Sequence, residues 1–400
     1  MQKIEATFRV VTPMFMSGAD QSKAELRLPS IKGALRFWWR ALAWSRYGDL
    51  EKIREEEARL FGSTDEGQAA VLMKLSSPAP PKISEKGQVL KDGDRVVGEG
   101  ARYLGYGVME AFASRNKGTQ AGQLTRPCLL SPFEFTLELR FGRRSTEQQL
   151  ISLAKALELM GLAGSLGSKS RKGYGSLTLT KLSYSNEPWS PPSDVHEMVE
   201  SLKKFSKDSP HPPFTALSRD SRFIVVEGEE GESTLSLLNR IGREMVFYRS
   251  WGRNGKVLGS PSEKNFKDDH DLMIKDDHDL MSSLKTNIKY PRRVVFGLPH
   301  NYGKQRCLQV APAHHDRRAS PLFIHIHQAK NADAPLAVLS FLPSAFLPQN
   351  EPLKLLNTTA LPRYDKSFWK PIDDFLERMK GTNQQRPLKR RERFSQVVEV

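Results

Sequence analysis

The sequence predicts an α+β fold, and three observations support this prediction. Apolar and polar residues alternate strictly at 3–10 and 133–141, which indicates strands because successive side chains of a strand point to opposite faces. Helical periodicity indicates helices from about 30 to 47 and from 145 to 160. With one further strand after each helix, the first half has the order β-α-β-β-α-β, which is that of a ferredoxin-like domain.

The first strand, helix and second strand are expected in the first 75 residues. In the strand at 3–10, four apolar residues share one face: Ile4, Ala6, Phe8 and Val10. Ser30 is expected to cap the helix that ends near Tyr47, because serine is a favoured residue at a helix start. A short strand is expected at 71–75. Residues 76–125 are rich in proline, glycine and charge, and we interpret them as a long insertion.

The third strand, second helix and last strand follow this insertion. The strand at 133–141 alternates most regularly, and the helix at 145–160 carries four apolar residues on one face: Leu150, Leu153, Ala154 and Leu157. Leu177 opens the last strand. A glycine-rich loop at 161–175 lies between this helix and this strand, so the fold places it at one end of the expected sheet.

The chain is expected to form two domains, since two is the natural number for 400 residues. The first covers residues 1–187. Residues 188–215 carry six prolines and read as a linker. The second domain covers residues 216–400 and shows a weaker series of elements. Its expected strands lie at 223–226, 293–296, 322–327 and 337–341, and its expected helices at 232–248 and 366–379.

Two segments of the second domain are expected to lack regular structure. The sequence Lys-Asp-Asp-His-Asp-Leu-Met occurs twice between 267 and 281. Two copies are too few for a repeat architecture, so we interpret them as a local duplication in a mobile loop. The basic segment 389–393 reads as a disordered tail.

Composition favours a polyanionic partner and excludes several classes of protein. The formal net charge is +15 and the pI is near 9.7, which is typical of nucleic-acid binding. The two cysteines, Cys128 and Cys307, exclude a disulfide framework and a cysteine-rich zinc site. No apolar run reaches the length of a membrane span, and the first residues lack the core of a signal peptide. We therefore expect a cytoplasmic protein without membrane contact.

The glycine-rich loop is the strongest functional feature of the sequence. Glycines let backbone N–H groups approach a ligand, and cations beside such groups form a cradle for an anion. The tyrosine adds a flat face on which a base can stack. We predict RNA contacts for the loop residues Gly164, Gly167, Ser168, Lys169, Ser170, Arg171, Lys172, Gly173 and Tyr174. Gly167 and Gly173 are expected to adopt a positive φ, and the three cations are expected to lie on the surface of the loop.

Two known phosphate motifs do not match. The P-loop requires a glycine-lysine-serine or glycine-lysine-threonine end that no window of this chain supplies. The dinucleotide fingerprint requires a strand before its glycines and a helix after them, and here the order is reversed. An ordinary solvated turn remains the alternative interpretation of the loop.

The first helix carries a stripe of cations. Lys32, Arg36 and Arg40 recur every four residues and so share one face. Trp39 lies beside them, and Gly33 is expected to allow a ligand or a neighbouring backbone to approach closely. We predict that these five residues contact RNA. The alternative is an ordinary solvated face of an amphipathic helix.

Candidate catalytic and metal-binding residues form no recognised motif. His325 and His327 share one face of an expected strand, and His314 and His315 precede them, but a zinc site needs three or four convergent ligands. Asp20 has no evident partner for acid–base work on a phosphodiester. We expect no catalytic residue, no metal and no cofactor.

Three segments resemble a known family. The first is Thr12-Pro13-Met14-Phe15, followed by Ser17-Gly18-Ala19-Asp20 and by Ala24-Glu25-Leu26-Arg27, and it continues from Pro29-Ser30-Ile31-Lys32-Gly33 to Arg40. The others are the glycine-rich loop and Arg317-Arg318-Ala319-Ser320-Pro321-Leu322. Together they resemble the first subunits of Cmr-type (type III-B) CRISPR effector complexes, which belong to the RAMP (repeat-associated mysterious protein) superfamily. The resemblance covers residues 10–45, 161–177 and 290–345.

The resemblance implies two ferredoxin-like RAMP domains with long insertions, and a place at the head of a ribonucleoprotein. It implies guide RNA, complementary target RNA and other RAMP subunits of the Cmr complex as partners, in antiviral defence. It also implies that the subunit binds RNA without cleaving it, and it adds Arg317 and Arg318 to the RNA-contacting residues.

Two alternatives remain open. A RAMP endoribonuclease that processes the guide precursor would share the fold and the glycine-rich loop, but such enzymes generally carry a catalytic histidine in the first domain. Here the first histidine is His196, in the expected linker. The other alternative is a basic RNA-binding protein that acts alone.

Overall fold

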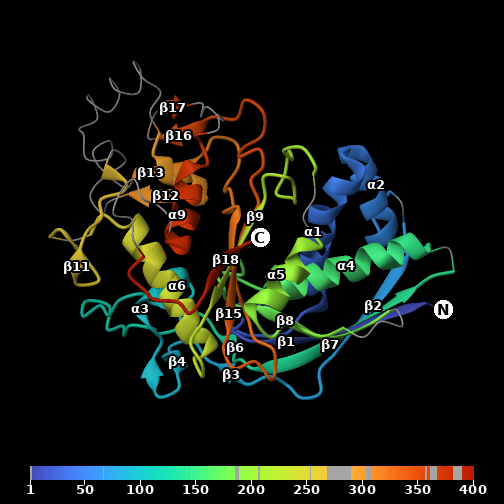
Figure 1. The fold of residues 1–400 in the computed structure, drawn as a ribbon, viewed down its shortest axis with the longest axis horizontal. Helices are drawn as coiled ribbons and strands as arrows, with labels where there is room; N and C mark the ends of the chain where they lie inside the picture. The colour runs from blue at the N-terminus through green and yellow to red at the C-terminus, as the bar shows by residue number, and fades with distance from the viewer. Residues whose placement is uncertain are drawn as a thin grey trace.

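The computed structural model describes residues 2–400 with gaps. The residues outside the description are 66, 144, 185–188, 206–207, 253, 268–289, 303–307, 356–357, 361–366 and 382–389. Most of the duplicated segment at 267–281 and the first residue of the basic tail therefore lie outside the described residues. The mixed helix-and-sheet architecture predicted from the sequence is confirmed (Figure 1).

The first half of the chain builds a four-stranded antiparallel sheet with the strand order β2-β7-β1-β8. Its strands are β1 (Lys3–Val10), β2 (Val71–Ser76), β7 (Phe133–Phe141) and β8 (Leu177–Ser183). The apolar residues of β1 and β7 are buried as the alternation predicts, and Phe8 stacks on its cross-strand partner Phe135 with ring centroids 5.5 Å apart. One face of this sheet is covered by α1 (Leu28–Tyr47), α2 (Leu50–Phe61) and α4 (Glu147–Ala163).

The start of α1 differs from the sequence prediction. The helix begins at Leu28 and not after Ser30, and Pro29 lies in its first turn. Proline fits there because the first backbone N–H groups of a helix have no partner within the helix. Arg27, in an extended conformation, precedes the helix, and Gly48 ends it with φ +59°.

The second half builds a four-stranded antiparallel sheet with the order β14-β15-β9-β18. Its strands are β9 (Arg222–Glu227), β14 (Leu322–His327), β15 (Leu336–Phe341) and β18 (Val397–Glu399), and its helices are α6 (Thr234–Arg249) and α9 (Lys370–Lys380). Along the chain these elements follow the order β-α-β-β-α-β, as those of the first sheet do. A further helix, α5 (Val195–Lys203), lies between the two halves.

Two predictions for the second half are wrong. The segment expected as a strand at 293–296 is part of a 3₁₀ helix, η1 (Arg292–Phe296). The tail expected to be disordered is ordered where it is described, because the backbone N–H groups of Arg391 and Glu392 donate to the buried carboxylate of Glu244 at 2.6 Å. The tail then leads into β18, which pairs with β9.

The long insertions form small elements around the two sheets. Residues 76–130 contribute β3 (Ile83–Ser84), β4 (Lys91–Asp92), β5 (Arg95–Val96), α3 (Glu99–Leu104) and β6 (Cys128–Leu129). The second half adds the pair β10 (Lys256–Val257) and β11 (Ser260–Pro261), and a third sheet made of β12 (His300–Tyr302), β13 (Leu308–Pro312), β16 (Leu353–Leu355) and β17 (Thr358–Ala360). Helix α3 packs against α6 through Gly100 and Gly242, at which no β-carbon has room.

The two large sheets share their packing. One apolar cluster joins α1 and α4 of the first half to Phe323, Val225 and Val338 of the second sheet. The other face of the second sheet packs on α6 and α9. Because α1 and α4 contact both sheets, they set the position of the glycine-rich loop relative to the second half. No helix in the described part of the chain is long and apolar enough to cross a membrane.

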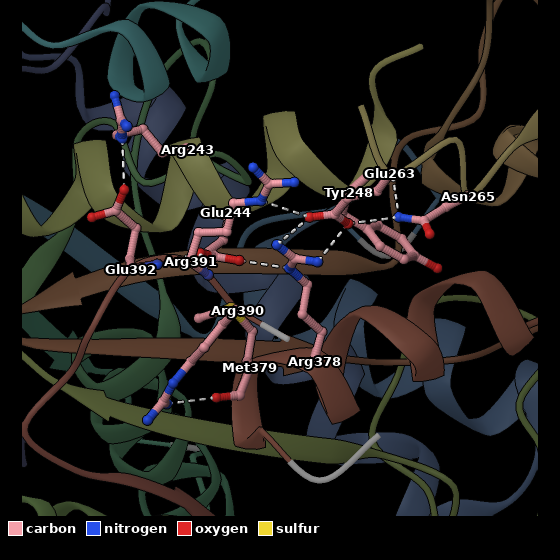
Figure 2. A network of polar contacts seen from close by, with 10 residues as sticks. All are labelled: Arg243, Glu244, Tyr248, Glu263, Asn265, Arg378, Met379, Arg390, Arg391 and Glu392. Carbon is pink, nitrogen blue, oxygen red and sulfur yellow. Dashed lines mark hydrogen bonds and ion pairs between the residues drawn. The ribbon is translucent and has the colours of Figure 1, made fainter. Parts of the chain in front are cut away.

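A buried ionic network fastens the end of the chain to α6 (Figure 2). Arg378 of α9 has no exposed surface, and it donates to Glu244 at 2.6 Å and to both carboxylate oxygens of Glu263 at 2.6 and 2.9 Å. Arg391 reaches the same Glu263 at 3.2 Å, and Glu392 accepts from Arg243 at 2.6 Å. This network connects the residues before β18 to the middle of α6.

Candidate nucleic-acid interface

The glycine-rich loop lies against the segment that follows β1. The hydroxyl of Thr12 donates to the carbonyl of Gly173 at 2.7 Å and accepts from the N–H of Ser176 at 2.9 Å. The N–H of Ser168 donates to the carbonyl of Phe15 at 2.8 Å. Two of the three segments that carry the family resemblance are therefore hydrogen-bonded to each other.

The backbone of the loop requires glycine at several positions. Gly167 and Gly173 have φ values of +83° and +84°, so the expectation of a positive φ is confirmed for both. Gly175 has φ +67°, and Lys169 itself adopts φ +65°. L-residues other than glycine enter this region at an energetic cost, so the loop is held by its contacts in a conformation that the chain alone would not favour.

The three cations of the loop occupy three different environments. Lys169 is partly exposed, and burial followed by the neighbouring Arg317 lowers its pKa. Arg171 donates to the carbonyl of Ser320 and stacks on the rings of Phe323, at 4.4 Å, and Phe37, at 5.4 Å. The Nζ of Lys172 is buried. The expectation of three surface cations is thus wrong for Arg171 and Lys172, because the second half of the chain covers them.

The aromatic rings predicted as stacking surfaces are buried. Tyr174 is 0% exposed, and its hydroxyl donates to the carbonyl of Ala101 at 2.8 Å. Trp39 is 3% exposed, and its indole N–H donates to the hydroxyl of Ser152 at 3.2 Å. Both rings belong to the core, so neither offers a face to a base.

The cationic stripe on α1 is paired within the protein. Glu57 of α2, which is buried, accepts from Arg36 at 2.6 Å and from Arg40 at 3.0 Å. Lys32 donates to the carbonyl of Phe61 at 2.6 Å. Gly33 is exposed, and a β-carbon there would meet nothing within 4 Å. The stripe therefore anchors α2 to α1. No contact among the described residues requires a glycine at position 33.

We expect Glu57→Gln to lower the free energy of unfolding by about 1–3 kcal/mol, since it weakens charge-assisted hydrogen bonds to two arginines. RNA affinity should stay at the wild-type value or rise, because the substitution removes one negative charge from residues that surround Arg40. Urea unfolding and RNA titration measure the two quantities. Glu55→Gln is the matched control on the same helix, where an exposed ion pair with Arg59, outside the groove described below, contributes at most about 1 kcal/mol. A marked loss of RNA affinity in Glu57→Gln would show that Glu57 positions the arginines for RNA.

Arg317 and Arg318, which begin the third segment that resembles the family, have different environments. Arg318 donates to the carbonyl of Phe346 at 2.6 Å and to the hydroxyls of Ser344, at 2.9 Å, and Thr215, at 3.2 Å. It therefore holds three backbone segments together. Arg317 is exposed. The structure brings this pair next to the glycine-rich loop, since Arg317 acts on Lys169 and Arg318 acts on Arg171.

A groove of about 670 Å³ opens beside these arginines, between α1 and α2 on one side and the second half of the chain on the other. Its lining includes the cations Arg40, Arg54, Arg317 and Arg318, the rings of Phe37, Phe214 and Phe346, and His315. Its single acid, Glu57, is already paired with two arginines. The groove thus has the composition that suits single-stranded nucleic acid, in which cations meet phosphates and rings meet bases.

The sequence prediction missed several residues of this region. Arg54, Phe214 and His315 belong to three distant segments, and no motif connects them. Arg126 bridges the hydroxyls of Ser17 and Ser168 and so joins the glycine-rich loop to the segment after β1. A lone arginine in a glycine- and proline-rich insertion carries no signal of this kind, because only the fold brings its partners together.

The remaining candidates for catalysis or metal binding are two histidines and one aspartate, and each is held by contacts within the protein. His325 and His327 are buried, and their ring N–H groups donate to the carbonyls of Gly164 and Pro192, at 2.8 and 2.9 Å. Burial lowers the pKa of His325 to about 3 and that of His327 to about 4. Asp20 is exposed and bonds to Ser22, and this contact lowers its pKa. Among the described residues, no group of three or more His, Cys, Asp or Glu side chains is placed to hold a metal.

Comparisons with known proteins relate the chain to one superfamily. Residues 7–178 match the family model of the RAMP superfamily. Two curated relatives come from Pyrococcus furiosus. The CRISPR system Cmr subunit Cmr1-2 is 28% identical over 182 residues, which cover 44% of this chain and 96% of that protein. The subunit Cmr1-1 is 26% identical over 354 residues, which cover 85% of this chain and 87% of that protein.

Solved structures share the fold. The crystal structure of apo Cmr1 from Pyrococcus furiosus aligns with a TM-score of 0.52 and 18% identity, covering 100% of this chain and 98% of that chain. A chain in the cryo-EM structure of the type III-B Cmr-beta complex bound to cognate target RNA aligns with a TM-score of 0.52 and 13% identity. The alignment covers 93% of this chain and 99% of that chain. At these identities the likeness concerns the fold alone.

Proposed function

We propose that this chain is a non-catalytic RNA-binding subunit of a type III-B CRISPR effector complex, because residues 7–178 match the RAMP superfamily model and the two curated relatives are Cmr subunits. Its proposed partners are guide RNA, complementary target RNA and the other Cmr subunits. The relatives are named as Cmr subunits, and one structural neighbour is part of a complex bound to target RNA. The matches extend over most of the length of each relative.

We also infer that each large sheet, with its helices, is a ferredoxin-like RAMP domain. The orders β2-β7-β1-β8 and β14-β15-β9-β18 support this, since both place the first strand between the third and the fourth. The proposed limits are 1–187 for the first domain, 188–215 for the linker and 216–400 for the second. The groove then lies at the junction of the two domains.

The observation that carries the proposed function is the charge of the groove. Arg54 and Arg317 are exposed there. Phe37 and Phe214 are partly exposed in the same lining and offer ring surface to bases. Single-stranded RNA fits this arrangement because its phosphates are accessible and its bases are free to stack. Recognition through the backbone would accept any sequence, which suits a subunit whose RNA varies.

We expect Arg54→Ala and Arg317→Ala each to weaken the binding of single-stranded RNA, and the double variant to show nearly the sum of both effects, as is usual for separate contacts. Each lost phosphate contact should also reduce the slope of log affinity against log salt concentration by about 0.7. Fluorescence anisotropy with a labelled oligonucleotide measures both. Arg140→Ala is the control, since Arg140 is exposed on β7 outside the groove. Wild-type affinity in the double variant would refute the groove as the RNA site.

We further expect purified protein to leave labelled RNA intact, with or without Mg²⁺ or Mn²⁺. The groove holds one histidine, His315, whose Nδ1 lies 2.7 Å from Glu351. The other acid–base group in its lining, Glu57, is paired with Arg36 and Arg40 and so is poorly suited to take up a proton during in-line cleavage. Cleavage that disappears in His315→Ala would favour the endoribonuclease alternative. Isolation of the native protein as a free monomer would favour a solitary RNA-binding protein, whereas a multi-subunit particle containing short RNA supports the proposal.

A further inference from the structure

Lys172, at the end of the glycine-rich loop, presents a buried ammonium group to the second half of the chain. Its Nζ has less than 1 Å² of exposed surface and no hydrogen-bond partner among the described residues. The backbone fixes the position of this residue, because Lys172 bridges to Ile324 of β14 and its N–H donates to the carbonyl of Lys169 at 2.8 Å. A buried ammonium group without a partner is unfavourable unless it is neutral or meets an anion.

Further basic groups surround Lys172 from three elements of the second half. Arg249 ends α6, and its Nη2 lies 3.4 Å from Nε2 of His300 in β12. Arg293 of η1 donates to the backbone carbonyl of Arg249 at 3.4 Å. The guanidinium of Arg249 stacks on the ring of Phe296, 4.5 Å from its centroid, while its Nε is buried without a hydrogen-bond partner among the described residues. Stacking on Phe296 thus orients the guanidinium of Arg249.

The pKa values of Lys172 and His300 are lowered by burial and by the basic groups around them. Burial, and then Arg249, Lys169 and Arg171, lower the pKa of Lys172 to about 7. Burial, and then Arg249, Arg293 and Lys172, lower the pKa of His300 to about 3. The three charged side chains that lower the pKa of Lys172 are therefore all cations. Lys172 thus lies among positive charges, and neither its Nζ nor Nε of Arg249 has a hydrogen-bond partner among the described residues.

We propose that Lys172, Arg249 and His300 form a binding site for one phosphate group, at the junction of the glycine-rich loop with α6 and β12. A phosphate oxygen accepts hydrogen bonds from an ammonium and a guanidinium at once, and so satisfies the two nitrogens that lack partners. None of its three residues belongs to the groove lining. The proposal that this site binds a phosphate of RNA rests on the proposed function. The proposal that it binds phosphate at all does not.

Phosphate binding at this site is linked to proton uptake. The bound anion favours the charged form of Lys172 and raises its pKa from about 7 towards the ordinary value for lysine. Above pH 7 the free protein holds this group largely neutral, so binding near pH 7.5 takes up a fraction of a proton. The cations that oppose this protonation are Lys169 and Arg171 in the loop and Arg249 on α6.

Calorimetric titration of the full chain with inorganic phosphate at pH 7.5 tests the site. In two buffers with different ionisation enthalpies, the wild type should bind with different observed heats, which report the net proton exchange of the protein and of phosphate together. Lys172→Met should weaken phosphate binding at least about tenfold, as expected for a charge-assisted contact, and Lys181→Met, an exposed lysine on β8, should leave it unchanged. Undetectable phosphate binding by the wild type, or equal binding by Lys172→Met, would overturn the site.

A second variant and a melting curve keep the test independent of folding. Lys172→Met removes a buried charge, so its melting temperature at pH 7 should equal or exceed that of the wild type, and Arg249→Met should lose phosphate binding in the same way. Phosphate should raise the melting temperature of the wild type and of neither variant. A phosphate-induced shift of wild-type size in both variants would contradict the assignment.

Three oligonucleotides of one sequence distinguish the sources of the phosphate. A preference for a 5′- or 3′-phosphorylated strand that disappears in Lys172→Met identifies a terminal phosphate, and an equal loss of affinity for all three strands identifies an internal one. Unchanged binding of all three by Lys172→Met would remove the site from the RNA path. Phosphate binding without any RNA binding would instead refute the proposed function and leave the phosphate site standing.

Discussion

Replacing Arg378 by methionine is expected to lower the free energy of unfolding by about 3–5 kcal/mol, the range found when one partner of a buried ion pair is removed. The guanidinium is fully buried and neutralises Glu244 and Glu263, which are buried as well (Figure 2). Methionine fills much of the volume but leaves two carboxylates without this partner. The penalty therefore comes mainly from the acids that remain and much less from the lost packing.

Urea unfolding followed by tryptophan fluorescence measures this effect. Arg59→Met on α2 is the matched control, because Arg59 is exposed and its ion pairs with Glu55 and Glu56 are expected to contribute at most about 1 kcal/mol. Adding Glu244→Gln to Arg378→Met should recover part of the loss, since it removes one of the unpaired charges. A loss below about 1 kcal/mol in Arg378→Met would show that water or neighbouring arginines already compensate the acids.

Replacing Gly175 by alanine is expected to abolish RNA binding and to destabilise the first half of the chain. Gly175 has φ +67°, and a β-carbon there would lie 2.1 Å from the carbonyl oxygen of Leu166. That carbonyl belongs to rigid backbone, because the N–H of Leu166 donates to the carbonyl of Gly175. The loop must move to relieve the contact, which displaces Lys169 and the backbone N–H groups beside it. Strained backbone of this kind costs about 1–3 kcal/mol before the clash is added.

Gly118→Ala separates the effect of the dihedral angle from that of the clash. Gly118 has φ +62°, but a β-carbon there would meet nothing within 4 Å. We expect this control to lose about 1–2 kcal/mol, the cost of a left-handed conformation, and to bind RNA like the wild type. Thermal melts and RNA titrations of both variants, run side by side, decide the matter. Similar stability and similar RNA affinity in the two variants would refute the argument from close packing.

The periodic segments of this chain were predictable because local pattern determines them. The strands β1 and β7 follow from strict alternation, and α4 and α6 follow from their apolar faces. The strand β18 was missed because Val397–Glu399 is short and forms a strand only by pairing with β9. The segment at 292–296 is rich in β-branched residues, as strands are, yet tertiary packing turns it into a 3₁₀ helix.

The candidate site was less predictable than the fold. The sequence shows which residues are charged, but it does not show which partners these residues meet in the folded protein. Arg36 and Arg40 look available along the helix, but Glu57 reaches them from the next helix. Arg171 and Lys172 look exposed on a glycine-rich loop, but the second half of the chain covers them. The sequence correctly placed the loop between a helix and a strand and gave it a positive φ at Gly167 and Gly173.

The position of β18 has a consequence for how the protein is made. The first sheet is complete once Ser183 has been synthesised, whereas β9 keeps one edge unpaired until residues 397–399 have emerged from the ribosome. During that interval the edge of β9 exposes free N–H and carbonyl groups, which readily pair with strands of other chains. A newly made second half therefore carries an open sheet edge until translation is almost finished. A chain that ends before residue 397 should keep this edge open and aggregate more readily than the full chain.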